Sequence, residues 1–236
     1  MRRTIETEAL FLGAVPYGET AVVATWLTER EGKLSTMVRG ARSSRRRVNG
    51  ALDYVHGVYL RAEDTGAELL TLKEAVVRHV RLGVTGDLDA LAAAGTALRW
   101  VRHACPPRTP EPDVFQELSV LLDDLERQPS SAKGQGLLTF GLRLLRHVGY
   151  ELVFDRCASC GRPRPPARRA HVDAGRGGVI CRACHGGGEV LADDLLLRLA
   201  RISSGEVAQL SRKEGDLVMR LVTRAMTSHT ELAPPR

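Results

Sequence analysis

The chain has 236 residues, of which 43% are hydrophobic, so it is long enough to bury a core and does not have the composition of a disordered polypeptide. Aromatic residues make up only 4%, which argues against a broad platform of rings for stacking bases. The formal net charge is +6, and because clustered cations attract polyanions, a nucleic acid is the first partner to consider.

The N-terminal segment does not resemble a signal peptide, because it carries Glu6 and Glu8 and lacks a long apolar run. No window approaches the ~18 consecutive apolar residues that cross a bilayer. We therefore expect a cytoplasmic protein with no membrane partner, whose thiols stay reduced.

Residues 5–80 contain short apolar runs separated by turn signals. The runs are ALFLGAV, AVVATWLT, KLSTMVR, YVHGVYLRA and ELLTLKEAVV. Each has the length and the Val, Leu, Thr or aromatic content of a strand. Five short strands must close on themselves or be covered, so we predict an N-terminal OB-fold β-barrel over residues 1–80.

Five arginines follow the third predicted strand in the stretch VRGARSSRRR, which contains no acidic residue. A solvated loop and a basic localisation signal are the two plain interpretations. The position after a strand favours a DNA-binding loop, as does the use of arginine, whose guanidinium contacts phosphate in a bidentate way. The predicted DNA-binding residues of this region are Lys33, Arg39, Arg42, Arg45, Arg46 and Arg47.

Beyond residue 81 the apolar residues recur at helical spacing. The predicted helices cover residues 87–104, 113–128, 137–150, 192–203 and 214–229, with Asp87 or Thr85 available to cap the first. We predict an α-helical bundle over residues 81–236, interrupted by residues 157–188. That interruption is poor in large aliphatic residues and cannot build a conventional core. The fold class is thus mixed β and α, with several domains.

Four of the five cysteines form two Cys-x2-Cys pairs, and the pairs consist of Cys157 with Cys160 and of Cys181 with Cys184. Two such knuckles can place four thiolates around one zinc ion, and the closed coordination leaves no position for an activated water. We predict one structural Zn2+ that allows residues 157–188 to fold. Attachment of haem at CRACH would leave the first pair unexplained, and a redox dithiol is expected in a βαβ pattern that is absent here.

The predicted zinc module carries a second basic patch with a single acid, Asp173. Its arginines are Arg162, Arg164, Arg168, Arg169, Arg176 and Arg182, of which we select Arg168 and Arg169 as DNA contacts. No Ser/His/Asp set, phosphate-binding loop or two-metal carboxylate cluster is evident, so no catalytic residue is predicted and the protein is not expected to be an enzyme. An interaction adaptor with incidental DNA affinity is the alternative.

The segment PYGETAVVATWLTEREGKLSTMVRGARSSRRRVNGAL, a helical body, and the knuckles DRCASCGRP and GGVICRACH together resemble the bacterial recombinational repair family RecO. The resemblance spans residues of about 5 to 225. It implies an OB-fold followed by a helical domain with a zinc module, binding of single- and double-stranded DNA, and strand annealing. It also implies RecR and single-strand binding protein as partners, and loading of RecA onto coated single strands.

Overall fold

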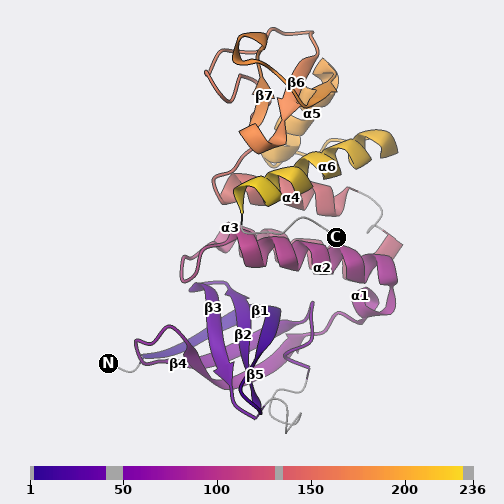
Figure 1. Ribbon diagram of the computed structural model, residues 1–236. Coiled ribbons are helices and arrows are strands. Elements are labelled where there is room, and N and C mark those ends of the chain that lie inside the picture. The colour runs from indigo at the N-terminus through magenta and orange to yellow at the C-terminus, as the bar shows by residue number, and fades with distance from the viewer. Residues whose placement is uncertain (1–2, 41–49, 131–134, 231–236) are drawn as a thin grey trace. The chain divides into compact units, whose positions relative to one another are not determined.

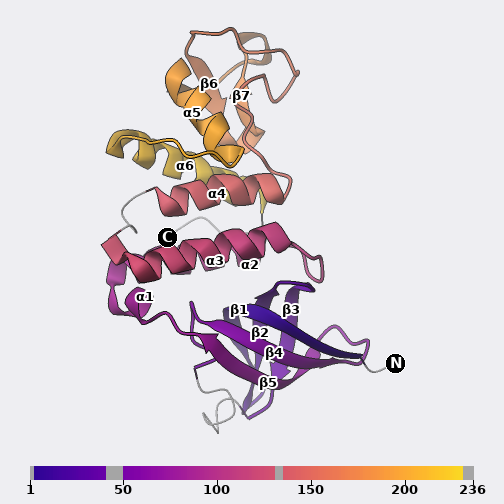
Figure 2. The same cartoon turned by 180° about the vertical axis from the view of Figure 1, so that it is seen from behind.

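The computed structural model describes residues 3–40, 50–130 and 135–230 (Figures 1 and 2). The chain divides into two compact units, residues 1–133 and residues 134–236. Four of the predicted DNA contacts, Arg42, Arg45, Arg46 and Arg47, lie outside the described residues. None of the helices in the described ranges combines the length and the hydropathy needed to span a bilayer.

The first unit begins with a closed barrel in the spatial order β1-β2-β3-β5-β4 (Figure 1). The strands are β1 Arg3–Tyr17, β2 Ala21–Thr28, β3 Gly32–Val38, β4 Gly57–Asp64 and β5 Leu70–His79. Neighbouring strands are antiparallel, except that β3 and β5 run parallel. This confirms the predicted OB-type barrel. Strand β1 is longer than predicted because one part of it pairs with β4 and another with β2, past a bulge between Phe11 and Gly13.

The barrel core forms around Trp26, which is fully buried. The Trp26 indole packs edge-on against Phe11, with ring centroids 5.4 Å apart. Its Nε1 donates a hydrogen bond to the Thr36 hydroxyl at 2.9 Å, so the polar atom of this buried ring is satisfied. Alternating small and large residues from all five strands fill the remaining interior.

Three helices complete the first unit: α1 Leu82–Gly86, α2 Leu88–Ala104 and α3 Pro112–Arg127. Helix α2 begins as predicted at Asp87, whose carboxylate accepts from the Ala90 N–H at 2.9 Å. The almost fully buried Arg81 guanidinium pairs with Asp123 of α3 and donates to the Val55 carbonyl. This bond set fixes the link between the barrel and α3.

The second unit contains α4 Gly136–His147, α5 Asp193–Ser203 and α6 Arg212–His229. Each of these helices buries one stripe of mainly leucine and valine, as predicted from the spacing. Helix α6 begins with a capping box, in which Ser211 and Glu214 each accept from the other's backbone N–H.

In the chain, a small sheet comes between α4 and α5, and the spatial order of its strands is β7-β6-β8. Strands β6 and β7 are labelled in Figure 2. Its strands are β6 Ala170–Asp173, β7 Gly178–Ile180 and β8 Glu189–Leu191, with short 3-10 turns η3 Ala174–Arg176 and η4 Arg182–Cys184. Val172, Val179, Ile180 and Leu191 are buried here, together with Phe154. The segment predicted to have no conventional core therefore has a small apolar one.

Candidate metal centre and nucleic-acid interface

The first knuckle is a tight turn from Cys157 to Cys160. The Gly161 N–H donates to the Cys157 carbonyl at 2.8 Å, and Gly161 takes a φ of +71°, which favours glycine. The Cys157 N–H donates to the Arg162 carbonyl at 2.8 Å and the Ala158 N–H to the Val179 carbonyl at 2.8 Å. The last of these bonds attaches the knuckle to β7, and the others close the turn itself.

The second knuckle follows β7 directly and forms the η4 turn. The Cys184 N–H donates to the Cys181 carbonyl at 3.0 Å, and His185 ends the turn in the left-handed conformation. Gly178, at the start of β7, lies so close to Val153 that an added Cβ would be 2.2 Å from its carbonyl oxygen. This close approach brings the strand that carries the second knuckle against the chain that leads into the first.

The four cysteine sulfurs form one cluster, within which all atoms lie at most 4.8 Å apart. The sulfurs of Cys160 and Cys181 are separated by 3.8 Å. Sulfurs placed tetrahedrally at a Zn–S distance of about 2.3 Å are about 3.8 Å apart, so the spacing fits a metal of this size.

The thiols of the cluster influence one another's ionisation. The Cys181 N–H, donated to the Cys157 sulfur at 3.4 Å, lowers the pKa of the Cys157 thiol to about 6. Hydrogen bonding with Cys181 and Cys160 raises the pKa of Cys184 to about 12. Four thiolates at this separation repel one another unless a cation lies between them, so the donor set fits a soft divalent metal ion.

Neither histidine of the module joins the four sulfurs in this cluster, as far as the described residues extend. Cys105 is buried in the first unit, at the end of α2, where burial raises the pKa of its thiol to about 12. A thiol with so high a pKa is a poor nucleophile at neutral pH.

Arg39 is exposed directly after the end of β3. Because Val38 lies opposite Val22, and Val22 lies opposite Pro16, the chain leaves the sheet at Arg39 at the same end of the barrel as the exposed Tyr17. The arginine-rich stretch therefore starts beside the hairpin that joins β1 and β2. Tyr17 was not selected from the sequence, although it belongs to the quoted PYGE motif.

Lys33 has a different setting from Arg39. Its Nζ donates to the Arg102 carbonyl in the last turn of α2 at 2.6 Å, where the helix dipole favours a cation. Lys33 thus connects β3 to α2. Its role as a DNA contact stays a prediction.

The arginines of the module fall into two groups. Arg164 is almost buried, where it pairs with Asp193 and donates to the carbonyls of Phe154 and Arg168. Arg176 donates to the Cys184 carbonyl and the Ser159 hydroxyl. The arginines that remain exposed without such bonds in the described part of the chain are Arg162, Arg168, Arg169 and Arg182.

Comparison with known proteins identifies the family. The family model described as "Recombination protein O N terminal" matches residues 1–81, and "Recombination protein O C terminal" matches residues 85–236. A DNA repair protein RecO of Anaeromyxobacter sp. (strain K) is 35% identical over 98% of this chain and 85% of its own length. A DNA repair protein RecO of Anaeromyxobacter dehalogenans (strain 2CP-1 / ATCC BAA-258) is 36% identical over 95% of this chain and 82% of its own length. A DNA repair protein RecO of Myxococcus xanthus (strain DK1622) is 31% identical over 76% of this chain and 72% of its own length.

The two family models match in order and together cover nearly the whole chain, which agrees with the barrel followed by helices and a cysteine cluster. The resemblance noted from the sequence is thereby confirmed. The chain belongs to the RecO family of DNA repair proteins.

Proposed function

We propose that this chain is a non-enzymatic recombination mediator in DNA repair. It binds single- and double-stranded DNA with little sequence preference and anneals complementary strands. With RecR as a partner, it assists the loading of RecA onto strands coated by single-strand binding protein. The observation that carries the proposal is the match of both RecO domains to a chain whose barrel continues into an arginine-rich stretch.

The main DNA contact of the proposal is the stretch from Arg39 to Arg47, together with Lys33. Guanidinium groups bind phosphate oxygens, and phosphates are the same in every sequence, so affinity is high without base discrimination. The exposed Tyr17, at the same end of the barrel as Arg39, offers one ring on which a base can stack.

Annealing follows from the same charges. Two complementary strands repel each other through their phosphates, and bound arginines neutralise part of that charge and release counterions. The bases of the strands then meet at a lower electrostatic cost. No bond is broken in this step, so the proposal requires no catalytic residue.

The cysteine cluster serves as scaffold in this proposal. One Zn2+ held by Cys157, Cys160, Cys181 and Cys184 would fix both knuckles and so position the exposed arginines of the module. Arg168 and Arg169 then contribute a second set of phosphate contacts.

A strand-annealing assay tests the proposal. Two complementary oligonucleotides, one with a fluorophore and one with a quencher, are mixed with the full chain, with and without prior coating by single-strand binding protein. We expect faster annealing than without protein in both cases, and intact strands after magnesium is added. No acceleration on bare strands would refute the mediator function, and zinc-independent cleavage would refute its non-enzymatic character.

An interaction adaptor is the second candidate function. It is favoured by three exposed leucines, Leu82 on α1 and Leu88 and Leu91 on α2, because exposed apolar side chains can bind partner proteins. An adaptor would bind partner proteins normally while leaving the annealing rate unchanged. The annealing assay separates the two candidates.

A further inference from the structure

The zinc module contains a cavity of about 380 Å³ beside the second knuckle. Its wall includes the exposed Arg162, Arg168, Arg169 and Arg182, and apolar parts from Pro163, Val179 and Ile180. Cys157 and Cys181 of the cysteine cluster also line it, and among the described residues no carboxylate does. Positive groups over an apolar floor, in a cavity of this size, are typical of a site for a small organic anion.

One histidine also contributes to the wall of the cavity. His171 lines the wall, and its Nδ1 is buried without a hydrogen bond from any described residue. The cavity is accessible to water and Nδ1 is not, so Nδ1 lies behind the wall and other atoms of His171 contribute to the lining.

The loop that carries the arginines is held in place from inside. Arg164 connects the Phe154 carbonyl, the Arg168 carbonyl and the Asp193 carboxylate, while its N–H donates to the Asp155 carbonyl at 2.9 Å. Arg168 and Arg169 therefore extend from a braced loop, which lowers the entropy lost when they bind a ligand.

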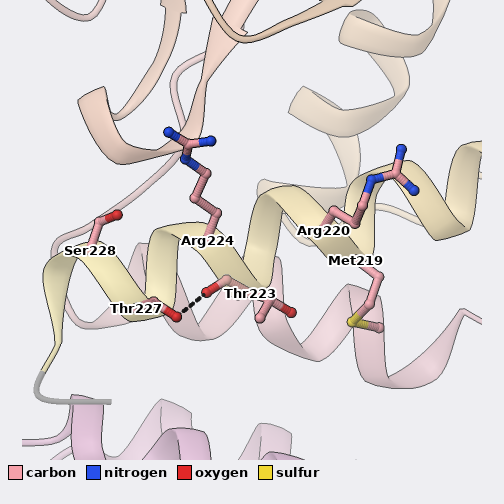
Figure 3. Close-up of a pocket in the computed structure, with 6 residues that line it drawn as sticks. All are labelled: Met219, Arg220, Thr223, Arg224, Thr227 and Ser228. Carbon is pink, nitrogen blue, oxygen red and sulfur yellow. Dashed lines mark hydrogen bonds between the residues drawn. The ribbon is translucent and has the colours of Figure 1, made fainter. Parts of the chain in front are cut away.

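A second basic pocket, on the surface of α6, serves as a comparison for this cavity. Arg220 and Arg224 extend from one face of α6, with the hydroxyls of Thr223 and Ser228 nearby (Figure 3). That pocket is shallow, all of its residues come from one helix, and Glu189 lies 3.9 Å from Arg220. It has the charge but lacks enclosure, so it provides a matched control.

We propose that the cavity beside the second knuckle binds one nucleotide of a DNA strand through its phosphate group, with the nucleoside against the apolar wall. Several arginines that lack an acidic partner suit a phosphate, whose oxygens accept bidentate hydrogen bonds. A volume of about 380 Å³ exceeds what a bare phosphate needs and leaves room for the attached sugar or base. The inference rests on the proposed function only for the source of the nucleotide.

Calorimetric titration of the full chain with thymidine monophosphate and with thymidine tests the cavity itself. We expect the monophosphate to bind measurably and thymidine at least about tenfold more weakly, because thymidine lacks the charged oxygens. The double variant Arg168→Ala/Arg169→Ala should bind thymidine monophosphate about tenfold or more weakly than the wild type. The single variant Arg162→Ala should also bind it more weakly. Arg220→Ala/Arg224→Ala removes the same charge from α6 and should leave it unchanged.

Equal binding of thymidine and its monophosphate would overturn the inference, and so would an equal loss in the α6 control. Oligothymidine with a 5′-phosphate or a 5′-hydroxyl separates the sources: a preference for the phosphorylated end indicates a strand terminus, and equal binding that still requires Arg168 and Arg169 indicates an internal nucleotide. Substitution of Arg45, Arg46 and Arg47 should not change monophosphate binding. Failure of DNA binding at the barrel and failure of the cavity are thereby distinguished.

Discussion

Arg164 and Asp193 form an ion pair in which only 7% of the arginine side chain is exposed. The pair connects the loop after the first knuckle to the first turn of α5, where a carboxylate is also favoured by the helix dipole. Although Arg164 belongs to a run of basic residues, its side chain holds the module together and is not a free surface charge.

Arg164→Ala should lower the free energy of unfolding by about 2–3 kcal/mol, because it leaves the Asp193 carboxylate and two backbone carbonyls without their donor. Arg162→Ala, two residues earlier but exposed, should change it by less than about 0.5 kcal/mol. Denaturant unfolding of both variants checks the pair. Equal effects would show that the ion pair does not stabilise the fold.

The cysteine cluster predicts about one equivalent of zinc per chain by elemental analysis. Cys181→Ser should abolish most of this zinc, and Cys105→Ala should not alter it, since Cys105 lies in the other unit. Chelation should unfold residues 157–188 while the barrel stays folded, as hydrogen exchange can show. Iron or haem absorbance in the purified protein would contradict the assignment.

Gly32 and Gly66 both have positive φ angles but differ in the space around them. An added Cβ at Gly32 would lie 2.0 Å from the Thr109 carbonyl oxygen, whereas nothing lies within 4 Å at Gly66. Gly66→Ala should cost about 1 kcal/mol from its left-handed backbone alone, and Gly32→Ala about 3 kcal/mol or more. Similar melting temperatures for the two variants would mean that β3 and the connector to α3 are not in contact.

The carboxylate of Glu214 accepts from the Arg198 guanidinium and from the Ser211 N–H, which lowers its pKa to about 2. A lowered carboxylate pKa stabilises the fold above the ordinary value of 4.5, and this stabilisation is lost as the pH falls toward 2. The free energy of unfolding of the wild type should exceed that of Glu214→Gln by about 1 kcal/mol at pH 7. This difference should disappear as the pH falls from 4.5 toward 2.

Wild type and Glu214→Gln contain the same cysteine cluster. Protonation of its thiols at low pH therefore changes the free energy of unfolding of both proteins equally and cancels from the difference. Glu206→Gln, which alters an exposed pair with Arg201, is the control and should show almost no such difference at any pH. A difference in free energy of unfolding between wild type and Glu214→Gln that stays constant with pH would contradict the lowered pKa of Glu214.

Several features of this fold could be predicted from sequence because they depend on local patterns. The five barrel strands are separated by turn residues, Asp87 precedes a helical apolar stripe, and the two cysteine pairs have the spacing of zinc knuckles. Each signal lies within a few tens of residues, so no tertiary information is required.

Other features depend on contacts between distant residues. The bonds of Lys33 with Arg102 and of Arg164 with Asp193 span 69 and 29 positions, and nothing in the local sequence separates the buried Arg164 from the exposed Arg168. Strands β6 to β8 contain three or four residues each, too few for a period to emerge.

We propose that the arginines that follow β3 in the sequence bind DNA through its phosphates. The direct measurement is the affinity for single strands of several sequences, titrated over a series of salt concentrations. Arg45→Ala/Arg46→Ala/Arg47→Ala is compared with Arg30→Ala/Arg61→Ala/Arg78→Ala, which removes the same charge from exposed positions elsewhere on the barrel. We predict that the first variant binds all sequences more weakly and flattens the salt dependence by about 2–3 units of slope, with a much smaller change in the second. Unchanged affinity and slope in the first variant, or equal losses in both, would contradict the account.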